Sequence, residues 1–203
     1  NLSDHTSSLP RMPSNFNPAD PLNPYADYSV QQLYDFLSSC TLTREIGSEY
    51  EYSNLAVGLL GHILSLHSGK PYEELMLTTI ANPLGMHETK IMFDANMKNN
   101  LAVGHANGVE VPNWDLPTLA GAGAIKSSTS DLLKFMSANI GLTSTNLAPA
   151  MTISHTPRHN KAGGSSVGLG WHINQSMHGP IVWHNGATGG YRAFAGFNKF
   201  QKL

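Results

Sequence analysis

The sequence has 203 residues with a formal net charge of −2 at pH 7, and only 13% of the residues are charged. A field this weak gives no electrostatic footprint for nucleic acid, and no run of Lys or Arg indicates a membrane surface. The apolar fraction of 40% is enough to bury a core, and no stretch is long and apolar enough to span a bilayer.

The amino-terminal 27 residues are predicted to be irregular. A series of prolines from Pro10 to Pro24 removes backbone donors and disfavours helix at the preceding residues. A loop of this length is usually functional or packed on another part of the protein. The chain begins at Asn1, without a start methionine or a basic-then-apolar leader, so we expect it to start within a longer gene product.

Two helices are predicted next. Ser29 begins a capping box for a helix over 30–39, in which apolar side chains share one face. Leucines recur at helical spacing over 55–69. Within this second helix Gly58 and Gly61 cost helix propensity, so we predict that they permit close packing against a neighbouring segment.

The middle of the chain alternates between helix and loop. A third helix is predicted over 71–80, since proline is well accommodated at a first helical position. Residues 87–125 are predicted to be mixed and loop-rich. Ser128 and Asp131 have capping-box spacing at the start of a fourth helix, and a weaker fifth helix is predicted over 146–153.

The periodicity changes towards the end of the chain, where apolar runs are separated by glycine-rich turns. Strands are predicted over 167–172, 181–184 and 191–197, in an antiparallel meander with two open edges. The fold class is therefore α+β. We predict a mainly helical domain with a long N-terminal loop over 1–125 and part of an α/β domain over 126–203.

Two sequence signatures are typical of a nucleophilic serine. Gly164 to Gly168 has the spacing G-x-S-x-G around Ser166, but that motif needs a buried strand before the serine and a helix after it. Polar residues precede Ser166 and a predicted strand follows, which favours a plain Gly/Ser loop. In S-x-x-K a lysine amine takes the serine proton. No lysine of this sequence has a serine three residues before it, so the chain contains no such nucleophile.

The segment Tyr52-Ser53-Asn54 admits two interpretations. A tyrosine at the start of a helix lies in positive potential, which favours tyrosinate and would let Tyr52 act as a general base with the Asn54 carboxamide nearby. In the simpler alternative, Ser53 or Asn54 is the helix cap and Tyr52 packs as a hydrophobic staple. Local sequence favours the alternative.

The segment from His184 to Tyr191 is rich in small residues. A hydrogen-bonding side chain on a strand followed by glycines lets a substrate lie along the strand edge, with backbone N–H groups available to an oxyanion. The simpler alternative is a β-hairpin whose glycines serve the turn. None of the ten histidines forms an H-x-x-x-H or H-E-x-x-H motif, so we expect neither a metal nor a cofactor.

Taken together and in order, these segments resemble the class C β-lactamase and penicillin-binding serine-hydrolase family. The resemblance covers residues 5–198 and rests on the order and spacing of several short motifs. The matching segments are His5–Pro10, Gly47–Asn54, the helix Leu55–Leu66, Pro83–Met86, Gly121–Ser128 with its helix, Gly168–Trp171 and His184–Gly190. Their order favours a catalytic interpretation of Tyr52 and His184 over the local alternatives.

The resemblance implies a β-lactamase/transpeptidase-like fold, with an active site between an α/β domain and a helical domain. The family has three signatures, S-x-x-K, Tyr-x-Asn and Lys-Thr-Gly. Tyr52-Ser53-Asn54 matches the second, and His184-Asn185-Gly186 stands at the third with His for Lys and Asn for Thr. The first is expected before residue 1, so the N-terminal nucleophile segment and the C-terminal elements of the fold are expected outside this chain.

The resemblance also implies roles for individual residues. Tyr52 would act in the proton-transfer network, and Asn54 would contact substrate and the lysine of S-x-x-K. His184, Asn185 and Gly186 would bind substrate along the strand edge. The N–H of Ala187 would complete the oxyanion hole together with the N–H of the nucleophilic serine.

The histidine at position 184 departs from the family pattern. A lysine there is a permanent cation that holds a carboxylate, whereas a histidine with an unperturbed pKa of about 6.5 is mostly neutral at pH 7. We therefore expect weaker carboxylate recognition than in a β-lactamase, with a preference for ester or D-amino-peptide hydrolysis over efficient β-lactam turnover.

The leading hypothesis is a fragment of an active-site-serine hydrolase that acts through an acyl-enzyme on an ester, peptide or β-lactam and is inactive by itself. The alternatives are a non-catalytic module that binds cell-wall peptide, and a fragment that forms homo-oligomers through open sheet edges. The resemblance implies a periplasmic or secreted bacterial protein. The single cysteine, Cys40, allows no internal disulfide, which also fits the cytosol.

Overall fold

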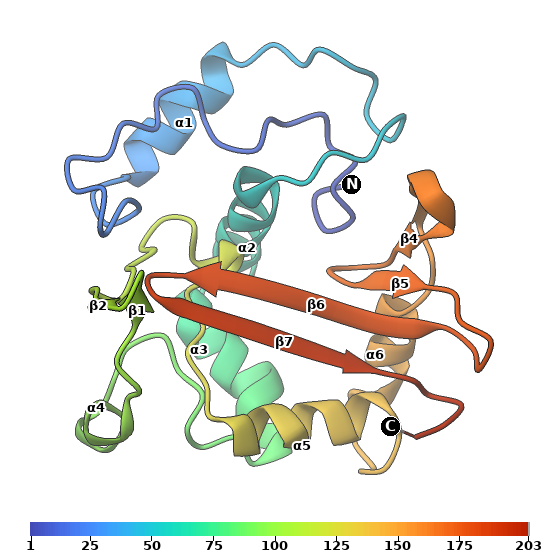
Figure 1. Cartoon of the computed structure of the whole chain (residues 1–203). Helices are drawn as coiled ribbons and strands as arrows, with labels where there is room; N and C mark the ends of the chain where they lie inside the picture. Colours follow the sequence, from blue (N-terminus) through green and yellow to red (C-terminus); the bar gives the residue numbers. More distant parts are fainter. Residues whose placement is uncertain (203) are drawn as a thin grey trace. The chain divides into compact units, whose positions relative to one another are not determined.

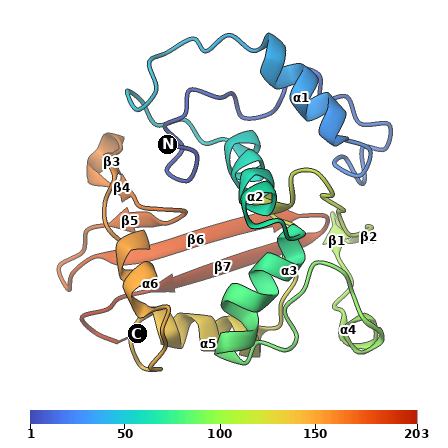
Figure 2. The same ribbon diagram turned by 180° about the vertical axis from the view of Figure 1, so that it is seen from behind.

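Figures 1 and 2 show the computed structural model of the chain, in which residues 1–202 are described. The chain forms two compact units, each built from three stretches of sequence. Unit 1 comprises Asn1–Tyr72, Ile91–Ile125 and Gly186–Ala193, and unit 2 comprises Glu73–Lys90, Lys126–Asn185 and Phe194–Leu203. The domain boundary predicted after residue 125 stays a prediction.

The first two helices of unit 1 confirm the sequence analysis. Helix α1 spans Val30–Ser39 with the capping box in place: the Ser29 hydroxyl accepts from the Gln32 N–H at 3.2 Å, and the Gln32 side chain accepts from the Ser29 N–H at 2.8 Å. Helix α2 spans Asn54–Ser68. It ends at Gly69, whose left-handed backbone suits a residue without a Cβ.

The long N-terminal loop has no helix or strand before α1, as predicted, and is held by backbone hydrogen bonds to the segment before α2 and to the first turn of α2. The carbonyl of His5 accepts from Glu51 N–H at 2.8 Å, and the carbonyl of Arg11 accepts from Leu55 N–H at 3.2 Å. The loop also contributes buried Leu9, Tyr25 and Tyr28 to the core of unit 1. It is therefore a packed part of this unit, as its length suggested.

Close packing along α2 depends on its glycines. A Cβ added at Gly58 would lie 2.7 Å from the Leu119 side chain, and one at Gly61 would lie 2.9 Å from the Gly121 Cα. Gly121 belongs to the short 3-10 helix η3 (Ala120–Ala122), which lies along α2. The predicted reason for these glycines is confirmed: they let one backbone approach another.

The remainder of unit 1 is loop-rich, as predicted for 87–125. It contains the short helix α4 (Ala95–Asn100) and a two-stranded hairpin of β1 (His105–Ala106) and β2 (Val109–Glu110). The tip of the β6–β7 hairpin, Gly186–Ala193, also belongs to this unit.

The predicted third helix changes type along its length. Helix α3 spans Tyr72–Met76 and continues as the π-helical η1 (Leu77–Ala81) and the 3-10 turn η2 (Asn82–Leu84). Helix α5 spans Thr129–Asn139, and α6 spans Ala148–Ser154. These positions confirm the fourth and fifth predicted helices.

The capping box predicted at Ser128 forms only by half. The Ser128 hydroxyl accepts from the Asp131 N–H at 3.2 Å, but the Asp131 carboxylate accepts from Glu88 N–H at 2.7 Å and Thr89 Oγ1 at 3.0 Å. Lys134 donates to the same carboxylate at 2.8 Å. The buried carboxylate therefore ties the 88–89 segment to α5 instead of closing the cap.

The larger sheet of the described chain has the strand order β3-β4-β5-β6-β7. Its strands are β3 (His159–Asn160), β4 (Ser166–Val167), β5 (His172–Asn174), β6 (Ile181–Thr188) and β7 (Tyr191–Phe197). The pairs from β3 to β6 are antiparallel. Strands 191–197 and 181–184 were predicted correctly, although β6 runs four residues further, to Thr188.

The single strand predicted over 167–172 is wrong, because this stretch contains the turn between β4 and β5. A Cβ at Gly168 would lie 2.3 Å from the Ser154 carbonyl oxygen, and Gly170 has a φ of +76°. The Gly168 N–H donates to the Trp171 carbonyl at 2.8 Å and closes the turn. The sheet therefore has more strands than the predicted three, with β3 and β7 at its edges.

One face of the sheet in unit 2 is packed against helix α5. Buried Ile173, Val182 and Phe197 come from three strands, and Met136 and Ile140 pack on them. Figure 2 shows α6 in front of the strands as well. None of the helices formed by residues 1–202 combines the length and the apolar character that a membrane crossing requires.

Candidate active site

Tyr52 and Asn54 flank the residue that caps α2. The Ser53 hydroxyl accepts from Ala56 N–H at 2.9 Å and donates to the Pro10 carbonyl at 2.6 Å, and the Ser53 N–H donates to Nδ1 of His5 at 3.1 Å. Ser53 is therefore the cap, as the local alternative proposed. Because the Ser53 hydroxyl accepts the N–H at the start of the helix, the side chains of Tyr52 and Asn54 are not needed as caps.

The carboxamide of Asn54 is oriented by a tyrosine of the N-terminal loop. Its Nδ2 donates to the Tyr25 hydroxyl at 3.0 Å. The Tyr25 ring is buried between Phe16 and Trp114, with centroid distances of 5.1 and 5.6 Å. The sequence analysis missed Tyr25, since nothing in a proline-rich loop marks one tyrosine as the partner of a residue 29 positions away.

The ring of Tyr52 lies between a histidine and an arginine of the same loop. Its centroid is 4.4 Å from that of His5 and 5.3 Å from the Arg11 guanidinium carbon. Burial raises the pKa of Tyr52, the Arg11 cation opposes this, and Tyr25 raises the pKa further. The net direction is upward, so burial outweighs the nearby positive charge and favours the neutral phenol over the tyrosinate of the first interpretation.

The strand candidates divide between the units. His184 and Asn185 belong to unit 2, whereas Gly186 and Ala187 belong to unit 1 together with Tyr52 and Asn54. His184 is partly buried, and its ring is parallel to that of His172 at 5.3 Å. Burial lowers the pKa of His184, opposed by a hydrogen bond with the Asn185 backbone. The imidazole is therefore neutral at pH 7, in the direction that the sequence analysis expected.

The glycines after His184 have different functions. A Cβ added at Gly189 would lie 2.3 Å from the Pro112 carbonyl oxygen, and one added at Gly190 would lie 2.4 Å from the His105 backbone nitrogen. Gly190 also has a φ of +75°. Turn geometry and close packing account for these two, as the simpler alternative proposed. Gly186 is exposed, and nothing lies within 4 Å of its Cβ position. Packing therefore gives no reason for a glycine at 186.

Ser166 lies in strand β4 and not at a nucleophile elbow. It pairs with Asn160 of β3 and Ile173 of β5, and its exposed fraction is 6%. A turn and a further strand follow it, where the elbow requires a helix. Both its burial and its context favour a structural serine.

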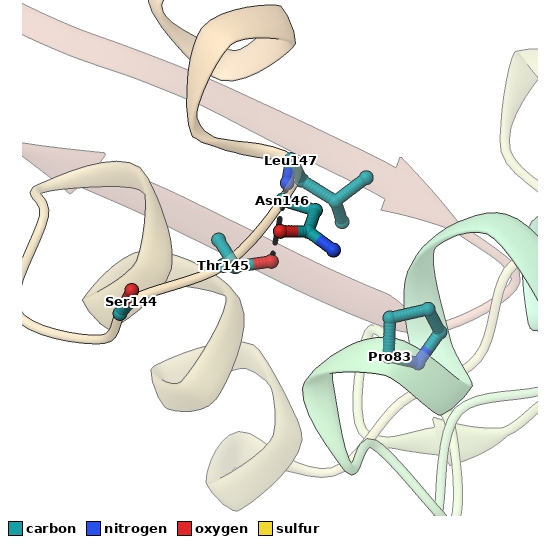
Figure 3. Close-up of a pocket in the computed structure, with 5 residues that line it drawn as sticks. All are labelled: Pro83, Ser144, Thr145, Asn146 and Leu147. Carbon is teal, nitrogen blue, oxygen red and sulfur yellow. Dashed lines mark hydrogen bonds between the residues drawn. The ribbon is translucent and has the colours of Figure 1, made fainter.

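Each unit also contains a cavity. In unit 2, a space of about 390 Å³ is lined by Pro83 and the loop from Ser144 to Leu147, where the Thr145 hydroxyl accepts from the Leu147 N–H (Figure 3). In unit 1, a space of about 420 Å³ is lined by hydroxyl groups, Cys40 and Glu51. Among residues 1–202, no three His, Cys, Asp or Glu side chains gather in a way that would hold a metal ion.

The α+β arrangement of helices and antiparallel strands is that of the β-lactamase-related serine hydrolases. The chain belongs to the Beta-lactamase family, whose model matches residues 1–203. The fold predicted from the motifs is confirmed by solved structures that cover 99% of this chain.

Two curated relatives show the range of the family. The D-alanyl-D-alanine-carboxypeptidase/endopeptidase AmpH of Escherichia coli K12 is 33% identical over 136 residues, which are 67% of this chain and 34% of the relative. A Beta-lactamase of Pseudomonas fluorescens is 31% identical over 130 residues, 63% of this chain and 36% of the relative. The match thus spans about a third of the length of each.

Solved structures match more of their own length. A Beta-Lactamase/D-Alanine Carboxypeptidase from Pseudomonas syringae superposes with a TM-score of 0.84 at 22% identity, and 63% of that chain is covered. A class C beta-lactamase superposes with a TM-score of 0.83 at 24% identity, with 60% covered. At these identities the likeness defines the fold and not the substrate.

Proposed function

We propose that this chain supplies the Tyr-x-Asn and strand-edge portions of an active-site-serine hydrolase that acts on esters, amides or β-lactams. The observation that carries the proposal is the placement of Tyr52 and Asn54 at the start of α2, one on each side of the capping Ser53. Because Ser53 and the N-terminal loop hold this turn rigidly, both side chains have defined positions. Membership of the Beta-lactamase family supports the reaction class.

In the proposed reaction, the S-x-x-K amine takes the proton of the serine hydroxyl, the serine oxygen attacks the carbonyl carbon, the C–N or C–O bond breaks, and the leaving group takes a proton from Tyr52. Water then cleaves the acyl-enzyme and restores the serine. Tyr52, a neutral phenol, passes its proton towards the leaving group and recovers it through the S-x-x-K amine. Asn54 orients the substrate amide, and the Ala187 N–H donates to the oxyanion.

We also propose that the 203-residue chain alone does not form an acyl-enzyme, because it contains no S-x-x-K. The chain would be incubated with a fluorophosphonate probe and with a fluorescent penicillin, followed by intact-mass measurement. No stoichiometric adduct is expected. An adduct that disappears in Ser166→Ala would overturn this proposal and make Ser166 the nucleophile. A polypeptide that joins this chain to an S-x-x-K segment is expected to be labelled by the probe, and Tyr52→Phe is expected to slow that labelling.

The substrate is proposed to be an ester or a D-amino peptide in preference to a carboxylate-dependent β-lactam. Burial keeps His184 neutral, so it offers hydrogen bonds without the permanent charge of a lysine. The endopeptidase activity in the name of the AmpH relative is compatible with such a substrate, because an endopeptidase cleaves an internal bond and does not need a terminal carboxylate beside it. The family relationship also suggests a periplasmic or secreted location.

The preference would be measured on the polypeptide that carries an S-x-x-K segment, with cephalosporin and simple-ester hydrolysis in competition at pH 6 and pH 8. Faster ester turnover is expected at both pH values. His184→Lys is expected to increase kcat/KM for the cephalosporin and leave that for the uncharged ester nearly unchanged. Much faster cephalosporin turnover by the unmodified protein at both pH values would contradict the proposal.

A further inference from the structure

A lysine and a second histidine lie behind His184 in unit 2. Lys161 follows β3, His172 begins β5, and His184 lies on β6. The Lys161 Nζ is 3.2 Å from Nδ1 of His172. The His172 ring is in turn parallel to that of His184, with centroids 5.3 Å apart and an angle of 7° between the planes.

The contact with Lys161 assigns the tautomer of His172. An ammonium group has three N–H donors and no acceptor, so Nδ1 of His172 accepts this hydrogen bond. A ring nitrogen that accepts carries no proton, which places the imidazole proton on Nε2. Protonating Nδ1 would remove the acceptor and place two cations 3.2 Å apart.

The surroundings of His172 restrict its ring as well as its proton. The residue is 8% exposed and pairs with Trp183 across β5 and β6. The centroid of the Trp183 ring is 4.7 Å away at an interplanar angle of 46°, while the His184 ring is nearly parallel to that of His172. Packing, the strand register and the Lys161 hydrogen bond together leave this ring one orientation.

We propose that Lys161 and His172 are positioning residues for His184: Lys161 fixes the tautomer of His172, and the fixed ring of His172 sets the plane in which His184 meets substrate. The inference deepens the proposed function and rests on it, since it treats His184 as the substrate-binding residue. Its consequence is specificity, because a neutral, oriented imidazole hydrogen-bonds an ester or amide oxygen but does not replace a cation for a carboxylate.

The test is ¹⁵N NMR of the histidine rings in the 203-residue chain at pH 7.5, which needs no turnover. The long-range couplings to the ring protons are expected to show His172 with unprotonated Nδ1 and protonated Nε2. A His172 in the Nδ1–H tautomer or as imidazolium in the unmodified chain would overturn the proposal without any variant.

Variants then test the connection to His184. Lys161→Met is expected to turn the single tautomer of His172 into a mixture and to shift the His184 ring signals, whereas Lys161→Arg, which keeps a donor, retains both signatures. The control is Lys98→Met, which removes an exposed lysine of unit 1. Unchanged His172 and His184 signals in a folded Lys161→Met chain, or equal changes in the control, would refute the proposal that Lys161 and His172 position His184. The proposed hydrolase function would be unaffected by that result.

Discussion

Acid is expected to destabilise unit 2 through His155, a buried histidine that the proposed reaction does not use. Its exposed fraction is 9%, and its ring packs against Trp171 and Phe197 with centroids 5.7 and 4.9 Å away. Nε2 lies 2.8 Å from Oδ1 of Asn139, whose Nδ2 donates to the Phe135 carbonyl. The His155 Nε2–H is therefore the donor. Nδ1 is buried with no partner among the described residues, so a proton added there finds no acceptor.

The magnitude follows from the pKa of His155. Burial, helped by the charge of Lys199, lowers it from 6.5 to about 4. Because the folded-state pKa lies below the unfolded one, the stability contributed by the neutral ring is complete above pH 6.5 and is lost as the pH falls towards 4. Each pKa unit is worth about 1.4 kcal/mol, which gives about 3 kcal/mol in total and about 2 kcal/mol between pH 7 and pH 5.

Urea denaturation at pH 7 and pH 5 measures this loss directly. His155→Gln keeps an N–H donor for Asn139 and has no group that titrates, so the difference in unfolding free energy between the two pH values is expected to shrink by about 2 kcal/mol. A smaller acid loss remains, since the lowered pKa of His184 has the same sign. The matched control is His87→Gln, an exposed histidine of the same unit. An equal pH difference in the His155→Gln and unmodified chains would refute the reasoning.

Three further predictions concern stability at pH 7, each checked by urea denaturation with thermal melts as a second measurement. Gly61→Ala should cost about 1–3 kcal/mol, because its Cβ would meet the Gly121 backbone at 2.9 Å, and a neutral result would disprove that contact. Ser65→Ala on the same helix should be neutral or stabilising, since its buried hydroxyl has no partner among residues 1–202; a loss above about 1 kcal/mol would contradict this. Asp131→Asn should cost about 3 kcal/mol by weakening its bonds to Glu88 and Lys134, and a loss below about 1 kcal/mol would argue against the network.

The sequence predicted the helices well because their ends are set by local chemistry. The capping box at Ser29 and the left-handed Gly69 act within a few residues, and both form as expected. The strand over 167–172 failed for the opposite reason. Its apolar alternation is real, but the tight approach of Gly168 to the Ser154 carbonyl breaks it, and that approach depends on tertiary packing.

The candidate site shows the same division. The Tyr52-Ser53-Asn54 signature was visible in the sequence, and so was His184 at the position of the lysine of Lys-Thr-Gly. The upward direction of the Tyr52 pKa could not be read from the helix end, because burial of its ring by the N-terminal loop is a long-range effect. Tyr25, Lys161 and His172 were missed since each contributes through a partner distant in sequence.

The alternation of the chain between its two units constrains how it can be made. Unit 1 needs the residues up to Ala193, and unit 2 needs those that follow, so neither is a continuous stretch that an expression vector or a protease could isolate. The first stretch of unit 1 ends at Tyr72, far along the sequence from the β6–β7 tip that belongs to the same unit. Folding of unit 1 therefore depends on contacts of high sequence separation and is expected to be slow.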